Sequence, residues 1–297
     1  MSRTSFNPYL AVIIGVIAVS FGSIFAKAAE APSLVIAFYR IALTVLLLAP
    51  VALATSWAEL RSMRRRDVAL ACLSGLMLAL HFATWITSLN YTTIASSTVL
   101  VNMHPLFVIT GGYFFYKEKI SLSGLLGAAL ALAGCLVIGI SDFRIGGQAL
   151  YGDILAVIGA IAVSGYMLVG RGLRNHLSLL PYIVIVYFVT GVALLLAVLA
   201  YRLPLANYTP GTWLMFFLAA LIPTIMGHTV FNWAFRYVKG AVVSVSILGE
   251  PVGATILAYF IFKQVPTFSQ LAGGLIILIG LVIFIQSNAR QGSSTAN

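Results

Sequence analysis

Ten long apolar runs, separated by short polar breaks, occupy almost the whole chain of 297 residues. They lie near 9–29, 33–56, 68–89, 94–116, 122–141, 151–170, 179–201, 211–235, 240–262 and 268–287. Each run is close to the roughly 20 apolar residues that a helix needs to cross a bilayer. The runs are continuously apolar and do not alternate, which excludes transmembrane β-strands. The pattern predicts an all-α polytopic membrane protein with ten transmembrane helices.

The composition supports this class and excludes most soluble ones. Hydrophobic residues make up 61% of the chain and charged residues only 8%, against about 25% charged residues in a typical soluble domain. The two cysteines, Cys72 and Cys135, lie in apolar runs without a metal-binding spacing. We expect them to be buried thiols.

The net charge of +10 is a signal of topology. If the N-terminus is cytoplasmic, twelve of the 17 Lys and Arg residues fall in cytoplasmic segments, four fall in outer segments, and Arg40 lies inside a span. This excess predicts that both termini are cytoplasmic. The cluster of Arg61, Arg64, Arg65 and Arg66 is expected to anchor the chain at the anionic leaflet. No aromatic stacking pattern accompanies it, so nucleic acid is not an expected partner.

The chain contains an internal repeat. Residues 91–138 and 237–284, which are 146 positions apart, are identical at twelve of 48 positions, including Pro105/Pro251 and Lys117/Lys263. Residues 1–145 and 146–297 are therefore interpreted as two five-helix repeats of one membrane bundle. Five is odd, so the second copy must enter the membrane from the opposite side. Such inverted repeats are associated with alternating access to a site at the midplane.

The residues that recur in this order resemble those of a known family. The motifs are Pro32…Tyr39-Arg40, Tyr91…Ala95, Pro105, Lys117-Glu118 and Gly127…Gly134, then Tyr237, Ala241, Glu250-Pro251 and Gly273…Gly280. They resemble the drug/metabolite transporter superfamily and, within it, the ten-span bacterial amino-acid metabolite efflux (EamA-type) family. The second repeat departs from this pattern at Gln264, which occupies the position equivalent to Glu118 and is not acidic. The resemblance implies a bacterial cytoplasmic (inner) membrane protein, most similar to exporters of aromatic and other neutral amino acids.

Polar side chains inside the spans are the candidate substrate-binding residues, because burying them in a membrane is costly. Spans three, four, eight and nine carry most of them at helical spacings that place each set on one helix face. The candidates are His81, Trp85, Ser88, Thr98, Asn102, His228, Asn232, Ser246 and Glu250, with Ser20 and Ser164 from spans one and six. The alternative is that the hydroxyls bond back to their own helices and that the rings only pack or bond across helices.

Glu250 is the only carboxylate deep in a span. Three roles are open: it carries a coupling proton, it pairs with a substrate ammonium, or it is structural beside Pro251. Pro105 and Pro251 interrupt helix hydrogen bonding and are predicted to gate the cavity, with static kinks as the alternative. Arg40, roughly 10 Å into its span at 1.5 Å per residue, either attracts a carboxylate or snorkels outward as an anchor, and the anchor is favoured.

Two further patterns complete the expectations. The glycines of Gly127…Gly134 and Gly273…Gly280 predict close packing of spans five and ten. There is no ATP-binding motif and no catalytic constellation, so an enzyme is not expected and neither is a cofactor. A metal site of His81, His228 and Glu250 would need a coincidence of packing.

The predicted function is a secondary transporter that exports small amphipathic metabolites, amino acids foremost, by alternating access. An uncoupled facilitator is the main alternative, and an intramembrane enzyme is a weaker one. The expected partners are the small-molecule substrate and the lipid bilayer. The oligomeric state stays open, with a monomer as one possibility.

Overall fold

The computed structural model describes residues 6–92, 97, 100–140, 147–263 and 265–294. Within these ranges the chain is helical with turns and contains no strand. Eight helical segments are long and apolar enough to cross a membrane, and a shorter apolar helix covers Leu122–Val137. The prediction of an all-α polytopic membrane protein is confirmed.

The helices follow the predicted runs closely. The first half contains α1 (Pro8–Ala28), α2 (Ser33–Ser62), α3 (Arg65–Ser88), α5 (His104–Tyr116) and α6 (Leu122–Ile140). The second half contains α7 (Gly147–Leu173), α8 (Leu179–Ala200), α9 (Pro210–Ala219), the π-helix η1 (Ala220–Thr229), α10 (Val230–Ala234), α11 (Gly240–Ile247), α12 (Glu250–Phe262) and α13 (Phe268–Ser294). The eighth predicted run is thus a single rod of α9, η1 and α10, whereas the ninth is divided between α11 and α12.

Several helices begin where the sequence provides a cap. The Asn7 side chain accepts a hydrogen bond from the Tyr9 amide at 2.9 Å, and Pro8 opens α1. Thr209 caps α9 in the same way, ahead of Pro210. Proline fits the first turn because its missing N–H would have no helical partner there. These local signals account for the starts of α1 and α9.

The fourth and ninth predicted spans are interrupted near their middles. Leu248 and Gly249 form a turn between α11 and α12, and Pro251 lies in the first turn of α12. Asn102 and Met103 form the equivalent turn before α5, whose first turn holds Pro105. The prolines therefore start new helices, as their disruption of helix hydrogen bonding predicts. We refer to the two turns, residues 102–103 and 248–249, as the joints.

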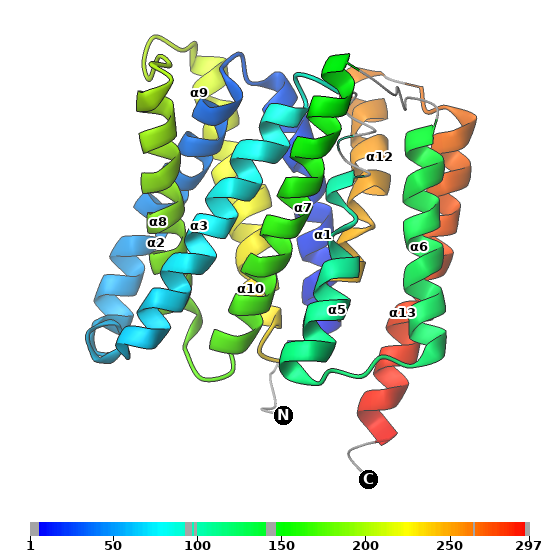
Figure 1. The fold of residues 1–297 in the computed structure, drawn as a ribbon. Helices are drawn as coiled ribbons and strands as arrows, with labels where there is room; N and C mark the ends of the chain where they lie inside the picture. The colour runs from blue at the N-terminus through cyan, green and yellow to red at the C-terminus, as the bar shows by residue number, and fades with distance from the viewer. Residues whose placement is uncertain (1–5, 93–96, 98–99, 141–146, 264, 295–297) are drawn as a thin grey trace.

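The two halves repeat one design in opposite orientations. Helices α5 and α12 each contain 13 residues, and each ends at a lysine with positive φ, Lys117 at 53° and Lys263 at 56°. The start of α1 and the end of α13 lie at the same end of the bundle, whereas α7 starts at the opposite end (Figure 1). The second repeat therefore runs through the bundle in the opposite sense from the first, as the odd number of spans requires.

Glycines set the closest helix contacts. Helix α6 packs along α13, and the pair stands at one edge of the bundle (Figure 1). A Cβ atom at Gly134 would lie 2.6 Å from the Gly273 carbonyl oxygen, and one at Gly127 would lie 2.6 Å from the Phe284 amide nitrogen. The predicted close packing of spans five and ten is confirmed. Of the two free cysteines, Cys135 is buried as expected, whereas Cys72 is half-buried.

Candidate functional site

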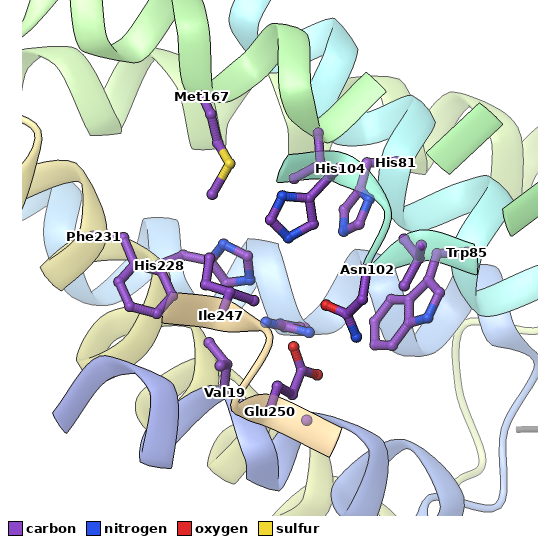
Figure 2. A pocket seen from close by; sticks show the side chains of 14 residues that line it. Val19, His81, Trp85, Asn102, His104, Met167, His228, Phe231, Ile247 and Glu250 are labelled. Atoms are coloured by element: carbon purple, nitrogen blue, oxygen red, sulfur yellow. The ribbon is translucent and has the colours of Figure 1, made fainter. Parts of the chain in front are cut away.

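A cavity lies where the two halves meet. Its wall is built from α1, α2, α3, α5, α7, η1, α10, α11 and α12, together with the joint before α5. The polar residues that line it are Arg40, His81, Asn102, His104, His228 and Glu250. Trp85, Met167 and Phe231 are among its apolar and aromatic residues (Figure 2).

The structure brings five predicted site residues together around this cavity. They are His81 and Trp85 from α3, Asn102 from the joint before α5, His228 from η1 and Glu250 from α12. Figure 2 shows the Asn102 side chain, from the joint before α5, and the Glu250 side chain, from α12, directed toward one another. The Trp85 ring lies beside Asn102. The predicted convergence of spans three, four, eight and nine is therefore present in the geometry.

Four other predicted residues are buried outside the cavity lining. Ser88 hydrogen-bonds to Ser97 at 2.5 Å and donates to the Trp85 carbonyl at 2.7 Å. Ser246 donates to the Val242 carbonyl of its own helix at 2.7 Å. These are the back-bonds that polar side chains form in membrane helices.

The other two, Ser20 and Ser164, occupy equivalent places in the two halves. Each hydroxyl donates to a carbonyl of its own helix and also to the carbonyl of the first residue of α12 or α5. The second acceptor is the Glu250 carbonyl for Ser20, at 3.4 Å, and the His104 carbonyl for Ser164, at 3.1 Å. These contacts hold the starts of α12 and α5 against α1 and α7, which supports a positioning role for both serines.

Asn232 also lies behind the wall of the cavity. Its amide nitrogen donates to the Tyr166 hydroxyl and to the His228 carbonyl, the latter at 2.7 Å. It therefore reaches the site through its neighbours. The remaining candidate, Thr98, lies outside the described residues.

His104 is a cavity residue that the sequence reasoning missed. It is 4% exposed, and its Nδ1 atom lies 2.7 Å from the Ser244 hydroxyl of α11. The shift of 146 positions that pairs Pro105 with Pro251 also pairs His104 with Glu250. The repeat was therefore the signal that would have found it: the two half-helices begin with a histidine in one half and a carboxylic acid in the other.

Arg40 corrects the expectation of an outward anchor. Its side chain is only 4% exposed and lines the cavity. The Nε atom donates to the Thr224 hydroxyl of η1 at 2.7 Å, and the guanidinium lies 4.6 Å from the centre of the Phe82 ring. A hydrogen bond and a cation–π contact inside the bundle replace water, so the side chain has no need to reach the membrane surface.

Arg40 and Glu250 place a guanidinium and a carboxyl group around one cavity. They interact electrostatically, but among the described residues the ion pairs within 4.0 Å are Arg171–Glu118 and His176–Asp67. No described residue donates a hydrogen bond to the Glu250 carboxyl. The space between the two groups is thus suited to a small molecule that carries groups of both signs.

Two buried donors on the wall have no partner. The Trp85 indole nitrogen and the Asn102 amide nitrogen make no hydrogen bond with any described residue. By contrast, one ring nitrogen of His81 lies 3.0 Å from the Gly159 carbonyl. Among the described residues no three His, Cys, Asp or Glu side chains form a metal-binding group.

Two arginines of the second half form polar contacts at the end of the bundle where α1 begins. Arg171 of α7 pairs with Glu118 at 3.0 Å and donates to the Phe235 carbonyl at 2.8 Å. Nearby, Arg174 donates to the Asn232 carbonyl at 3.0 Å, and burial lowers the pKa of Arg174 to about 10. That value leaves it charged at neutral pH. Of these contacts, the Arg171–Glu118 ion pair joins the two repeats, whereas the bonds to the Phe235 and Asn232 carbonyls lie within the second repeat.

Comparison with known proteins agrees with this architecture. The family model described as the EamA-like transporter family matches the chain twice, at residues 7–140 and 150–286. A Bacillus subtilis (strain 168) protein named uncharacterized transporter YxxF is 25% identical over 283 residues, which cover 94% of this chain and 90% of that protein. The pseudopaline exporter CntI of Pseudomonas aeruginosa is 22% identical over 223 residues, covering 74% of this chain and 76% of its own.

A solved crystal structure shares the fold. It superposes with a TM-score of 0.81 at 17% sequence identity and covers 98% of this chain and 99% of its own. The two family matches coincide with the two halves of the bundle and leave only short segments unmatched. The chain therefore belongs to the EamA-like transporter family, within the drug/metabolite transporter superfamily, and is a multi-span membrane transporter.

Proposed function

We propose that this protein is a secondary transporter that exports small amphipathic metabolites, with aromatic and other neutral amino acids as its foremost substrates. The observation that carries the proposal is the composition of the central cavity. It holds one cation, Arg40, one carboxyl group, Glu250, and an aromatic wall that includes Trp85 and Phe231.

Alternating access is the mechanism that this architecture supports. The cavity lies between two inverted repeats, and the two joints place half-helix ends at its wall, an arrangement shared by many transporters that rock around a central site. The Arg171–Glu118 ion pair joins the two repeats at one end of the bundle, so a rocking movement that separates the repeats there would have to break it. The excess of basic residues on one side supports an inner-membrane orientation with both termini in the cytoplasm.

An uncoupled facilitator is the second candidate, and one observation favours it. Arg40 supplies Glu250 with an opposite charge across the cavity. If this guanidinium keeps the carboxyl group ionised while a substrate ammonium binds to it, no proton accompanies transport. A coupled carrier instead requires Glu250 to gain and lose a proton during the cycle.

Liposomes separate these possibilities. The purified protein is reconstituted, and uptake of labelled phenylalanine is measured with and without a proton gradient. Accumulation that follows the gradient supports the coupled exporter, equilibration alone supports the facilitator, and no uptake of any amino acid contradicts the proposed substrate class.

The variant Glu250→Gln assigns the role of the carboxyl group. Loss of accumulation with retention of exchange between labelled and unlabelled substrate identifies Glu250 as the coupling residue, because exchange needs no net proton movement. A joint loss of exchange and affinity identifies it as the ammonium site. The matched control is Glu30→Gln, which alters an exposed carboxylate between α1 and α2 and should behave as the wild type.

A further inference from the structure

We infer that Trp85, Asn102 and Arg40 form a carboxylate-binding subsite at the start of α5, so that substrates are selected for an acid group bound on this side of the cavity. The inference rests on the proposed function and names the chemical group that the transporter recognises. It also fixes the orientation of the substrate, with the carboxylate beside α3 and α5 and any ammonium group toward Glu250 of α12.

The first support is the pair of unpartnered donors. The Trp85 and Asn102 side chains are 7% and 2% exposed and line the cavity, yet the Trp85 Nε1 and Asn102 Nδ2 atoms have no acceptor among the described residues. Buried donors almost always have partners, because leaving one unpaired is destabilising. The Trp85 ring and the Asn102 side chain lie beside one another (Figure 2), and two unpaired donors on one cavity wall indicate that a ligand provides the acceptor oxygens.

The second support is the unused part of the Arg40 guanidinium. Its Nε atom donates a hydrogen bond to Thr224, and its Cζ atom lies over the Phe82 ring. The terminal N–H groups make no hydrogen bond with any described residue. A fixed guanidinium with free terminal donors is well suited to a carboxylate, whose two oxygens match its geometry.

The third support comes from comparing the two half-helices. The N-terminus of a helix carries a partial positive charge that favours an anion. Helix α12 begins with its own carboxyl group, Glu250, whereas α5 has no acidic residue in its first turn and begins with His104. The first turn of α12 thus contains an acidic side chain, whereas the first turn of α5 contains none. A substrate carboxylate beside Asn102 would occupy the corresponding place in the first repeat.

Three probes of similar shape test this subsite by direct binding to the purified protein in detergent. They are phenylalanine, 3-phenylpropionate, which lacks the amine, and phenethylamine, which lacks the acid. We expect both acids to bind the wild type at least about tenfold more tightly than the amine, since a hydrogen bond to a charged group contributes about this factor or more. Equal or tighter binding of phenethylamine, or no binding by any of the three, would overturn the inference.

Two conservative variants locate the effect. Trp85→Phe keeps an aromatic ring but removes the N–H donor, so the affinity for both acids should fall about tenfold while that for phenethylamine stays unchanged. Asn102→Asp places a negative charge in the subsite and should reverse the preference in favour of the amine. The matched control is Trp57→Phe, which changes a tryptophan on the exposed face of α2 and should leave all three affinities unchanged.

The outcomes separate this inference from the proposed function. Selective, Trp85-dependent binding of acids without transport of any amino acid would retain the subsite and contradict the exporter. Transport of phenylalanine with unchanged affinity in both Trp85→Phe and Asn102→Asp would retain the exporter and overturn the subsite.

Discussion

The contact between α6 and α13 makes a quantitative prediction about a single methyl group. A Cβ atom at Gly280 would lie 2.5 Å from the Ala131 amide nitrogen and 2.6 Å from the Gly127 carbonyl oxygen. Ordinary van der Waals contact begins near 3.4 Å, and both neighbours are backbone atoms that cannot rotate away. The variant Gly280→Ala should therefore force the two helices about 1 Å apart, at an overpacking cost of about 1–3 kcal/mol.

The same helix provides the matched control. A Cβ atom at Gly274 would lie 3.7 Å from its nearest neighbour, a methyl group of Val252, so Gly274→Ala introduces no clash. Both variants gain the same backbone term, about 0.4–1 kcal/mol from the reduced freedom of the unfolded chain. The difference between the two variants therefore isolates the clash.

Thermal unfolding in detergent measures this difference. For proteins of 150–250 residues about 1 kcal/mol shifts the midpoint by roughly 2–4 °C, so Gly280→Ala should unfold several degrees below Gly274→Ala. Equal midpoints for the two variants would refute the backbone-to-backbone packing of α6 on α13. A lower midpoint for Gly274→Ala would refute the assignment of which glycine faces the partner helix.

Three further predictions concern the topology, the cavity wall and the Arg171–Glu118 ion pair. Reporter fusions at the C-terminus and in the loop at 142–150 should report opposite sides of the membrane, and the same side for both would contradict the five-plus-five inversion. A cysteine replacing Asn102 should react with aqueous thiol reagents and be protected by substrate, whereas one replacing the buried Asn232 should stay inert; the reverse pattern would displace the cavity. The variant Glu118→Gln replaces the ion pair with a hydrogen bond from the charged Arg171 to a neutral amide oxygen. It should weaken this contact by about 1 kcal/mol, which raises the population open at this end. Unchanged reactivity of the cavity cysteine toward reagents added from the cytoplasmic side would argue against this role.

The continuous apolar runs predict the helices of this chain well, because a membrane-spanning helix is apolar along most of its length. Each predicted run coincides with helical residues, and even the joint before α12 was marked by Glu250-Pro251. The π-helix η1 was not foreseeable, since no pattern of side chains distinguishes it. It matters for the site because Thr224, the partner of Arg40, lies within it.

The site was predictable only in part, for reasons that differ between residues. Helical spacing identified Trp85, which shares a helix face with His81 and Ser88. Glu250 was identified because an ionisable group inside a span must face protein. It could not separate a hydroxyl such as Ser246, which bonds to its own helix, from one that lines the cavity. Arg40 was predicted to be an outward anchor from its distance to the helix end. That distance says nothing about its partners on other helices. His104 lies in an apolar stretch and stands out only when the two repeats are aligned.

The two joints have a mechanical consequence. A continuous helix resists bending because its backbone hydrogen bonds must stretch or break. At Pro105 and Pro251 the chain has no amide hydrogen to lose, and the helix has already restarted. We therefore expect the two interrupted spans to behave as pairs of rigid helices that bend at the joints while the hydrogen bonds within each helix stay intact. Asn102 lies in one joint, and Glu250 is the first residue after the other. Bending at either joint would change the distance between these two side chains. The affinity for a bound molecule and the conformation of the protein would then change together.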